Sequence, residues 1–581
     1  MTEHKKLTGY PSIDKPWLKY YSEEAINAPL PKCSIFEYLW ENNKDSLDAV
    51  AIEYFGNRIT YRELFDNIEW AAAAFSKLGV EKGDSVVIVS VTLPEIIYSF
   101  YALNKIGAVP NMVDPRTNAD GIIEYANESN AKALIMIDAA CEKLDAIVSR
   151  ACAKSFIIVS PANSLTGIRK YAYRSKVSRK KSAAKVAYLW KSFFETGEHK
   201  KNASNNSDNK SNKDDCCVIV HTGGTSGTPK GVMISNYQLN ATVVQCSLSG
   251  FNMHRGDRWL GIMPPFIAYG IGNGLHLPLC KGMTLVLIPA FDPEKYDRLL
   301  LKHKPQHIVG VPSHYGSVVK SSMMRDVDLS FIVSPVVGGD GVEINNEKQI
   351  NAFLNKHNCK TNLIKGYGMT EICAAVCTTA RMDFNKEGSV GIPMTHSAIA
   401  VFDPDTCEEL MYNQCGEICM QGPHIMLGYY KNKSETNQVL RRHSDSSIWL
   451  HSGDLGYMDE DGCVFILGRI KRMIIRHDGF KVFPTMIETT IMTNQNVEEC
   501  CAVGKRDSTH SQGQLPHAFV VLKNDCKKTH HAIKHEISEK CRHNLPEYAQ
   551  PKQIHFVESL PLTSIGKVDY RALEKLAEEN E

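Results

Sequence analysis

The sequence lacks an excess of charge of either sign and lacks the cysteine spacing of a metal or disulfide framework. Lysine and arginine total 66 against 65 aspartate and glutamate residues, a net formal charge of +1, so no global attraction to nucleic acid is expected. The 18 cysteines form no paired C-x-x-C elements, and we interpret them as reduced thiols. Because the N-terminus has no apolar signal segment, we predict a cytoplasmic protein.

Long hydrophobic runs are also scarce. One stretch, Trp259 to Cys280, contains no charged residue other than histidine, and its length raises the question of a membrane span. It also contains Pro264, Pro265, Pro278 and four glycines. This composition favours buried strands and loops around a pocket over a membrane helix.

Helical and strand patterns alternate along the first part of the chain. Helices are predicted at 71–78 and 95–106, and strands at 85–91, 108–113, 134–137, 156–159 and 218–220. β-Branched runs separated by helical segments predict α/β layers around largely parallel strands. The length of 581 residues is enough for several such layers.

The last hundred residues carry apolar segments of their own, at 497–503, 518–522, 533–541 and 554–557. They suffice for a small α/β domain with a separate core. The segment 468–479, GRIKRMIIRHDG, is rich in charge and is typical of a domain boundary. We therefore predict an N-terminal domain over residues 1–468 and a C-terminal domain over residues 469–581.

A basic insertion interrupts the first domain at about residues 165–215. Residues 165–201 contain 11 lysines and arginines but 2 glutamates. Val186, Leu189, Trp190, Phe193 and Phe194 have the spacing of one helix face. This pattern fits a helix on an anionic membrane surface, through 168–194, and equally fits a helix docked on its own domain. The polar residues 200–215 predict a mobile loop.

The strongest chemical signal is TGGTSGTPKG, residues 222–231, directly after a predicted strand. Glycines let backbone N–H groups approach an anion, hydroxyls donate to phosphate oxygens, and lysine adds a positive charge. The segment is neither a Walker A loop nor a G-x-G-x-x-G motif. It predicts a polyphosphate site formed by Thr222, Gly223, Gly224, Thr225, Ser226, Gly227, Thr228 and Lys230.

The segment IVHTGGTSGTPK, residues 219–230, closely resembles the phosphate-loop signature of the adenylate-forming enzymes, which include acyl-CoA synthetases, luciferases and peptide synthetase adenylation domains. Further segments resemble motifs of this superfamily in the same order, at 59–64, 101–109, 367–371, 388–393, 452–454, 468–469, 479–488 and 561–571. The resemblance spans about residues 50 to 571. It implies a large N-terminal multi-layer α/β domain and a small C-terminal α/β domain on a hinge.

The resemblance also implies roles in forming an acyl adenylate from ATP and a carboxylate. Residues 222–230 would wrap the β- and γ-phosphates. Glu371 would hold Mg²⁺, a cation that favours oxygen ligands, with Thr225 as a further ligand. Thr370 would donate to the α-phosphate. Lys567 would bridge the carboxylate and the α-phosphate in the transition state.

The nucleoside and the second half-reaction are assigned in the same way. Tyr367 would stack on adenine, opposite Gly338 and Gly339, while Asp454 would bind the ribose hydroxyls with help from Arg469. Rotation about a hinge at Lys471 would then remove Lys567. The strand around Gly479 and Lys481 would face the site and line the path of the pantetheine arm of coenzyme A.

The predicted acyl pocket includes Phe266, Ile267, Tyr269 and Gly270, with the segments 336–339 and 372–376. Ile267 occupies the position where many members carry histidine, which leaves the gating of the thiol step open. No aspartate lies between residues 258 and 280, so an α-amino acid substrate is not expected. The apolar segments favour a fatty acid over an aryl acid. Asp340 departs from the small residue of many acyl-CoA synthetases and receives no role.

We therefore predict an AMP-forming acyl-CoA synthetase that uses ATP, coenzyme A and Mg²⁺. Two alternatives stay open. The acyl group could pass to the phosphopantetheine of an acyl or peptidyl carrier protein, or the chain could be a membrane-associated scaffold on a retired enzyme fold. The expected location is cytoplasmic, with peripheral contact on the inner membrane face as a variant.

Overall fold

The structure is a computed structural model that describes residues 7–167, 169–171, 173, 187–198, 211–222, 229–381, 385–562 and 568–579. The chain forms two compact units. The first unit comprises residues 1–14, 399–419 and 451–581, and the second comprises residues 15–398 and 420–450. This division does not test the domain boundary proposed at residue 468, which stays a prediction.

One sheet of the second unit has the strand order β19-β9-β8-β4-β3-β5-β6-β7. The strands are β19 (Gly428–Tyr429), β9 (Gly231–Ser235), β8 (Cys216–His221), β4 (Val109–Val113), β3 (Ser85–Val89), β5 (Ala133–Ile137), β6 (Ser155–Val159) and β7 (Tyr188–Leu189). The strands from β8 to β7 run parallel, and β9 turns back against β8. The predicted buried parallel strands are confirmed, since every residue of β3 and β5 is buried.

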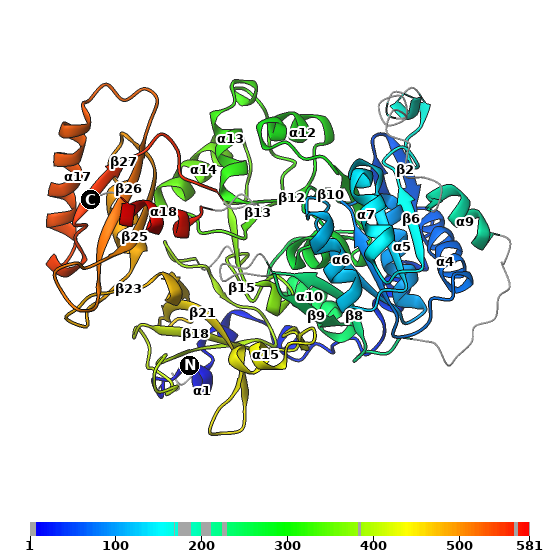
Figure 1. The fold of residues 1–581 in the computed structure, drawn as a ribbon, viewed down its shortest axis with the longest axis horizontal. Coiled ribbons are helices and arrows are strands. Elements are labelled where there is room, and N and C mark those ends of the chain that lie inside the picture. The colour runs from blue at the N-terminus through cyan, green and yellow to red at the C-terminus, as the bar shows by residue number, and fades with distance from the viewer. Residues whose placement is uncertain are drawn as a thin grey trace. The chain divides into compact units, whose positions relative to one another are not determined.

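Helices cover both faces of this sheet. Helices α4 (Tyr61–Lys77), α5 (Pro94–Lys105) and α9 (Trp190–Glu198) lie on one face, and α6 (Ala119–Glu128) and α7 (Leu144–Arg150) lie on the other (Figure 1). Crossover connections between parallel strands are right-handed. The connection from β3 to β4 and the connection from β4 to β5 run in opposite directions along the sheet, so their helices, α5 and α6, lie on opposite faces.

Helix α4 begins ten residues before the predicted start at Ala71. Thr60 and Glu63 form a capping box that satisfies the first backbone N–H groups. Tyr61, Leu64 and Ile68 are fully buried and extend the apolar face toward the N-terminus. The prediction of a helix at 71–78 rested on the alanine-rich C-terminal half and was too short. The cap at Thr60 explains why the helix begins at Tyr61.

Helix α9 answers the question raised by the basic insertion. Phe193 is 1% exposed and packs on Phe75 of α4, while the ring of Phe194 meets Trp70 edge-on at 5.6 Å. The helix approaches so closely that a Cβ on Gly197 would lie 2.0 Å from the Trp70 carbonyl oxygen. The apolar face of α9 therefore docks on its own domain.

Two parts of the predicted helix face are not in that helix. Leu189 belongs to β7, which pairs with β6, and its side chain is exposed. Leu189 pairs with β6 at the edge of the sheet instead of continuing the helix, so the helical spacing of the sequence was misleading at this residue. Val186 and most of the predicted mobile loop 200–215 lie outside the described residues. A peripheral membrane contact through 168–194 stays a prediction.

The second sheet of this unit has the order β16-β15-β14-β13-β12-β10-β11-β1-β2. Its strands are β16 (Ile392–Pro393), β15 (Cys377–Thr378), β14 (Ile364–Tyr367), β13 (Ser334–Gly338), β12 (His307–Gly310), β10 (Arg258–Gly261), β11 (Thr284–Leu287), β1 (Val50–Tyr54) and β2 (Asn57–Thr60). Helices α12 (Tyr296–His303), α13 (Pro312–Lys320) and α14 (Ile344–Lys356) pack beside β12 and β13 (Figure 1).

The uncharged stretch from Trp259 to Cys280 is strand at its start and helix at its end. It begins in β10, continues through a π-helical segment, Tyr269–His276, and ends in α11 (Leu277–Cys280). The prediction of strands and loops was therefore wrong for its second half. Among the described residues, no helix is both long and apolar enough to cross a bilayer.

Glu95 on α5 is a buried acid that should make the stability of the fold depend on pH. Its side chain is 1% exposed, and burial raises its pKa to about 7, although the Ser164 hydroxyl donates to it at 2.6 Å. Between about pH 4.5 and pH 7 the unfolded chain therefore ionises this group while the folded chain keeps it protonated. Folding then loses up to about 3 kcal/mol as the pH rises.

Glu95→Gln removes this titration, because an amide cannot ionise. We expect the variant to gain stability relative to the wild-type protein between pH 5 and pH 8, by roughly 2–3 kcal/mol. Urea unfolding at the two pH values measures the difference. If the difference in unfolding free energy between the variant and the wild-type protein were the same at pH 5 and pH 8, Glu95 would be ionised in the folded state, contrary to this account.

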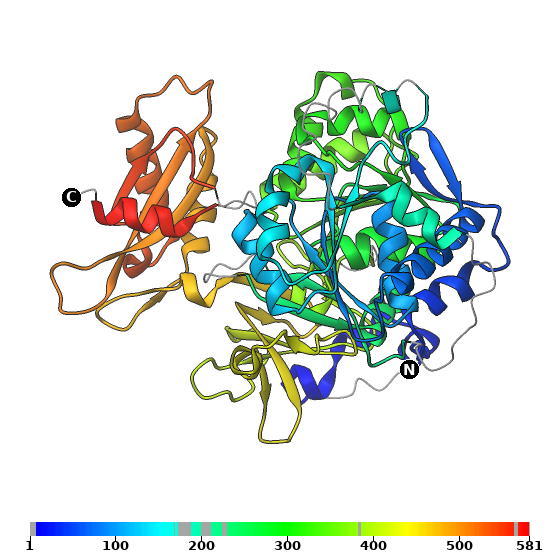
Figure 2. The same cartoon turned by 45° about the vertical axis from the view of Figure 1, so that its right-hand side comes forward.

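The C-terminal residues of the first unit form a small domain around the antiparallel pair β25 (Val497–Arg506) and β26 (Gln514–Leu522), with β27 (Gln553–Phe556) parallel to β26. Helices α16 (Pro484–Met492) and α17 (His530–Asn544) share a core with one face of this sheet, and α18 (Tyr570–Glu579) packs on the other (Figures 1 and 2). The predicted small α/β core is present.

A further sheet has β17 (Ala398–Phe402), β18 (Gly416–Gln421), β21 (Ile448–Met458) and β22 (Val464–Arg469) adjacent in that order. β21 and β22 are antiparallel, with Asp454 opposite Arg469. This register brings two of the predicted nucleotide-binding residues side by side.

Candidate active site

The predicted phosphate loop connects two antiparallel strands, β8 and β9. Its residues Gly223, Gly224, Thr225, Ser226, Gly227 and Thr228 lie outside the described part of the chain. Its two ends are fastened together, because the Thr222 N–H donates to the Lys230 carbonyl oxygen at 3.0 Å and the Lys230 N–H donates to the Thr222 hydroxyl at 3.2 Å. The strands therefore fix where the loop leaves and rejoins the sheet.

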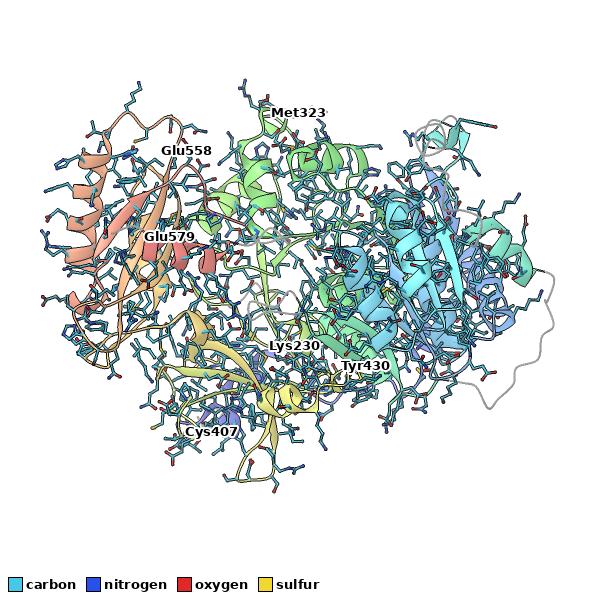
Figure 3. All side chains as sticks on the ribbon, viewed as in Figure 1. Lys230, Met323, Cys407, Tyr430, Glu558 and Glu579 are labelled. Atoms are coloured by element: carbon cyan, nitrogen blue, oxygen red, sulfur yellow. The ribbon has the colours of Figure 1, made fainter. Side chains whose placement is uncertain are left out.

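Lys230 contacts two residues that the sequence patterns did not single out. Its Nζ forms an ion pair with Glu435 and lies 4.9 Å from the centre of the Tyr429 ring. Figure 3 shows Lys230 near Tyr430, the residue that follows Tyr429 at the end of β19. The Tyr430 N–H donates to the Gly231 carbonyl oxygen at 2.7 Å, so β9 and β19 hold the lysine in place.

Tyr429 links this lysine to Glu371. The Tyr429 hydroxyl donates to Oε1 of Glu371 at 2.7 Å, and burial together with the carboxylate raises the pKa of Tyr429. Glu371 is 7% exposed, and its carbonyl oxygen accepts from Met426 at 2.8 Å. Three distant segments thus bring an acid, a phenol and a lysine together, with Thr370 beside the acid in the same 3₁₀ turn.

The predicted adenine-binding residues lie at the ends of adjacent parallel strands. Gly338 ends β13 and is paired with Gly366 of β14, which ends at Tyr367. Gly339 follows with φ +81°, a backbone conformation that favours glycine. The carboxyl ends of parallel strands are the usual position of ligand sites in α/β sheets. Their contact with adenine stays a prediction.

The predicted acyl-pocket segments converge in the same unit. A Cβ on Gly338 would lie 3.7 Å from Cζ of Tyr269, and one on Gly272 would lie 3.1 Å from the Cys373 carbonyl oxygen. Residues from 266–274, 336–339 and 372–376 are therefore neighbours. Gly270 is required locally, because a Cβ there would lie 1.7 Å from the Pro264 carbonyl oxygen.

The segment 266–274 contributes two polar side chains, Tyr269 and Asn273. The Tyr269 hydroxyl is buried and has no hydrogen-bond partner among the described residues, and burial raises its pKa. Phe266 and Ile267 are half-buried. Asp340 is exposed, and its carboxylate accepts from the Gly341 N–H at 2.8 Å. This bond stabilises the turn after Gly339.

Asp454 and Arg469 form an ion pair in the first unit. Oδ1 of Asp454 lies 2.7 Å from Nε of Arg469, and Asp454 is 5% exposed. The Ser452 hydroxyl donates to the Ile418 carbonyl oxygen at 2.6 Å and accepts from the Asp454 N–H at 2.9 Å. Gly453 has φ +71°. The sharp turn within β21 thus sets the direction in which the Asp454 carboxylate points.

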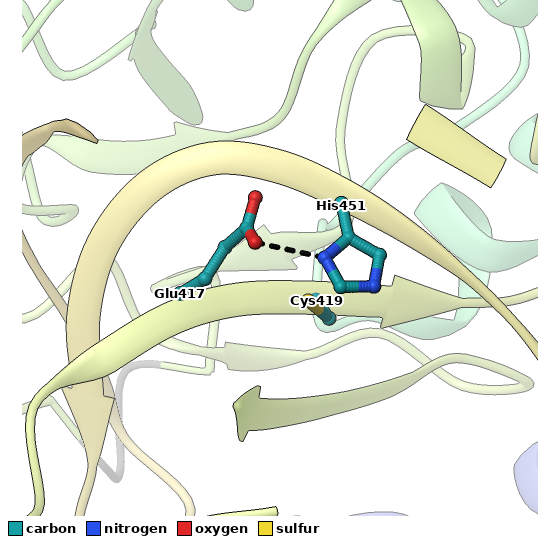
Figure 4. Close-up of side chains that lie close together, drawn as sticks. All are labelled: Glu417, Cys419 and His451. Atoms are coloured by element: carbon teal, nitrogen blue, oxygen red, sulfur yellow. Dashed lines mark hydrogen bonds and ion pairs between the residues drawn. The ribbon is translucent and has the colours of Figure 1, made fainter. Parts of the chain in front are cut away.

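Glu417 and His451 form a hydrogen bond next to this turn, and Figure 4 shows the pair. Nδ1 of His451 donates to Oε2 of Glu417 at 2.8 Å, and the Gly453 N–H donates to Oε1 at 2.9 Å. Both residues are 4% exposed. No sequence spacing indicated Glu417, because its partners lie on another strand.

Glu417→Gln should weaken nucleotide binding through this turn. The amide nitrogen would face one of two N–H donors, which costs about 1–3 kcal/mol at a buried position. We expect the KM for ATP to rise by about tenfold, which corresponds to a loss of roughly 1.4 kcal/mol of binding free energy. The KM for the acid should stay unchanged. Steady-state kinetics with Glu408→Gln, an exposed neighbour, is the control. Equal changes in both KM values would instead indicate a general loss of structure.

The remaining predicted residues lie in the first unit. Lys471 is exposed in a 3₁₀ turn, Ile470–Arg472. Gly479, with φ +83°, lies in the turn between β23 (Ile474–Ile475) and β24 (Lys481–Val482). Nζ of Lys481 is 3.4 Å from Asp405. Lys567 lies outside the described residues. The roles assigned to these lysines and to Gly479 stay predictions.

These features describe an α/β fold in which the predicted phosphate-loop and adenine-binding residues lie at strand ends. The model of the AMP-binding enzyme family matches residues 39–430, and that of the AMP-binding enzyme C-terminal domain matches residues 486–567. The chain belongs to the AMP-binding enzyme family. The predicted family is therefore confirmed.

The chain is similar to curated CoA ligases over most of its length. It is 27% identical over 571 residues to a long-chain-fatty-acid–CoA ligase of Bacillus subtilis, covering 98% of both chains. It is 28% identical over 548 residues to 4-coumarate:CoA ligase 1 of Petunia hybrida, covering 92% of both.

Solved structures show the same fold. ATP-bound MatB from Rhodopseudomonas palustris matches with a TM-score of 0.78 at 22% identity, covering 94% of this chain and 99% of that chain. The anthranilate CoA ligase AuaEII in complex with anthranoyl-AMP matches with a TM-score of 0.79 at 20% identity, covering 96% and 99%. The predicted adenylate-forming fold is confirmed.

Proposed function

We propose that this protein is an AMP-forming acid–thiol ligase that joins a carboxylic acid to coenzyme A. The carboxylate attacks the α-phosphorus of ATP, pyrophosphate leaves with the electrons of the broken P–O bond, and the acyl adenylate reacts with a thiol to release AMP. The contact of buried Glu371 with Tyr429, beside Lys230, carries the proposal. In such an arrangement the lysine supplies positive charge for a polyphosphate, and the carboxylate supplies oxygen ligands for its counter-ion. The CoA ligase names of the curated relatives support it.

In the first half-reaction, residues 222–230 bind the β- and γ-phosphates, and Thr370 donates to the α-phosphate. Glu371 would hold Mg²⁺, because carboxylate oxygens suit this ion and the Tyr429 hydroxyl donates to one of its two oxygens, Oε1. Thr225 is the second proposed ligand. When bound, Mg²⁺ neutralises phosphate charge. Lys567 brings the two anionic reactants together.

The nucleoside is held by the remaining predicted residues. Tyr367, Gly338 and Gly339 bind adenine, while Asp454 accepts from the ribose hydroxyls and Arg469 orients the carboxylate. The ion pair between these two side chains supports the second assignment. Because a carboxylate can accept two hydrogen bonds in parallel, one aspartate suffices for both hydroxyls.

In the thiol half-reaction, a rotation at Lys471 replaces Lys567 by the hairpin that carries Gly479 and Lys481. Coenzyme A is the proposed acceptor, and a carrier-protein phosphopantetheine is the alternative. A comparison of the two thiols in one assay separates them. We further propose a cytoplasmic protein with peripheral contact on the inner membrane face through 168–194, where Tyr188 and Leu189 are exposed.

The proposed substrate is a fatty or other apolar acid. The convergence around Tyr269 and Gly338 offers mainly apolar and small side chains, which suit an acyl chain. An aryl acid is the second candidate, favoured by the buried Tyr269 hydroxyl, which has no partner among the described residues and could bond a substrate oxygen. Relatives named for long-chain fatty acids and for 4-coumarate fit these two candidates.

Tyr269→Phe separates the two substrate classes. If an acyl chain fills the pocket, loss of an unpaired buried hydroxyl should raise kcat/KM for fatty acids by about 2–5-fold, because the cost of burying it disappears. If a hydroxylated aryl acid is the substrate, the loss of its partner should lower kcat/KM by about 10–100-fold. Parallel assays with palmitate and 4-coumarate measure both. A fall with palmitate would contradict the proposed fatty acid.

A further inference from the structure

We propose that His477, Asp507 and His510 bind a divalent transition-metal ion such as Zn²⁺. His477 comes from the turn between β23 and β24, and the other two come from the loop after β25. The site lies within the first unit and uses none of the residues assigned above to ATP, the acid or the thiol.

The three donor atoms already converge. Nδ1 of His510 lies 2.8 Å from Oδ2 of Asp507, and Nδ1 of His477 lies 3.2 Å from it, with all three atoms within 4.8 Å of one another. Nitrogen and oxygen ligands at about 2.0–2.2 Å from Zn²⁺ in a tetrahedral site stand roughly 3.3 Å apart. Two histidines and one carboxylate are a ligand set that zinc accepts, with its fourth position left to water.

The aspartate is oriented from behind. Its other oxygen, Oδ1, accepts from the Thr509 N–H at 3.0 Å and from the Thr509 hydroxyl at 2.6 Å. Asp507 is 1% exposed, so its position is set by the fold. Outer hydrogen bonds of this kind fix the orientation of carboxylate ligands in metal sites.

The two histidine rings are placed so that their nitrogens can bind an ion. Nδ1 of His477 is buried and makes no hydrogen bond of acceptable geometry among the described residues, although it faces the carboxylate. The His477 and His510 rings stack with centres 3.4 Å apart and planes 7° apart. To bind one ion, the rings must separate by about 1–2 Å, since coordinated imidazoles diverge from the metal. The His510 side chain is 45% exposed on its loop, so it has room to move.

The site would fasten two segments that approach closely. A Cβ on Gly513 would lie 2.2 Å from the His477 backbone nitrogen, so the loop after β25 and the β23–β24 turn already touch. Gly479 lies two residues after His477. On the proposed function, a bound ion would therefore steady the turn that faces the thiol in the second half-reaction.

Binding of Co²⁺, the spectroscopic substitute for Zn²⁺, tests the site on full-length protein stripped with a chelator. We expect one equivalent of Co²⁺ to produce a visible spectrum of nitrogen and oxygen ligands without a thiolate charge-transfer band, a band that the 18 cysteines would otherwise supply. Zn²⁺ should displace it. His510→Ala should lose this equivalent, or weaken its affinity by about 10–100-fold, and His477→Ala should do the same.

His531→Ala, an exposed histidine of α17, is the matched control and should keep the equivalent. Circular dichroism of His510→Ala checks that the fold is retained, since the substituted side chain lies on an exposed loop. The same stoichiometry and spectrum in wild-type protein and in all three variants would overturn the proposal, as would spectra dominated by thiolate ligands. No ATP or acid is present, so the result is independent of the proposed ligase activity.

Discussion

Lys567→Ala is expected to lower carboxylate-dependent exchange of pyrophosphate into ATP by about 10²–10³-fold, the loss typical of removing one donor that stabilises developing charge. Two anions meet in this step, and Lys567 is the cation assigned to both. The second half-reaction should survive, because the thiol attacks after Lys567 has left. Thioester formation from a supplied acyl adenylate should therefore stay within about threefold of wild type, a difference below 1 kcal/mol.

Lys575→Ala provides the control. Lys575 is an exposed lysine on α18, paired with Glu579, and its loss should leave both half-reactions unchanged. If Lys567→Ala lowered the two half-reactions equally, the lysine would have no role specific to adenylation, and the domain-rotation part of the account would fail with it.

Asp454→Asn is expected to lower kcat/KM for ATP by about 10²-fold. The neutral amide loses the ion pair with Arg469, in which Oδ1 and Nε lie 2.7 Å apart, and can accept from only one ribose hydroxyl in place of two. Hydrogen bonds to a charged group contribute about 1.5–3 kcal/mol each, which sets this magnitude. The KM for the carboxylic acid should change little. Steady-state kinetics with each substrate varied in turn measures both.

Asp525→Asn, at an exposed position of the same unit, should have no effect on either KM. Thermal unfolding of Asp454→Asn shows whether the loss of the ion pair has disturbed the fold. An unchanged KM for ATP in a folded variant would remove Asp454 from the nucleotide site.

The sequence predicted the family well because its motifs lie on short connections at strand ends. Thr222 and Lys230 flank one loop, Gly338 and Tyr367 end adjacent strands, and Asp454 lies in one turn, so each motif is contiguous in the chain. Strand positions followed from buried apolar runs. Helix boundaries followed less well, since the start of α4 depends on the cap at Thr60.

The residues that support the motifs could not be predicted in this way. Tyr429 reaches Glu371 across 58 positions and Glu417 reaches His451 across 34, and no periodicity in one sequence encodes such pairs. The sequence likewise did not determine whether the apolar face of the basic insertion contacts a membrane or its own domain. An apolar helix face has the same residue spacing whether it meets lipid or Phe75. Contacts between distant segments decided each of these cases.

Carboxylate-dependent exchange of labelled pyrophosphate into ATP, across acids from acetate to palmitate together with benzoates, tests the central claim most directly. We predict exchange that requires an acid and is greatest with a fatty acid, followed by an acyl thioester once coenzyme A is added. Bound ATP with no exchange for any acid would contradict the proposed ligase and would favour a scaffold on this fold.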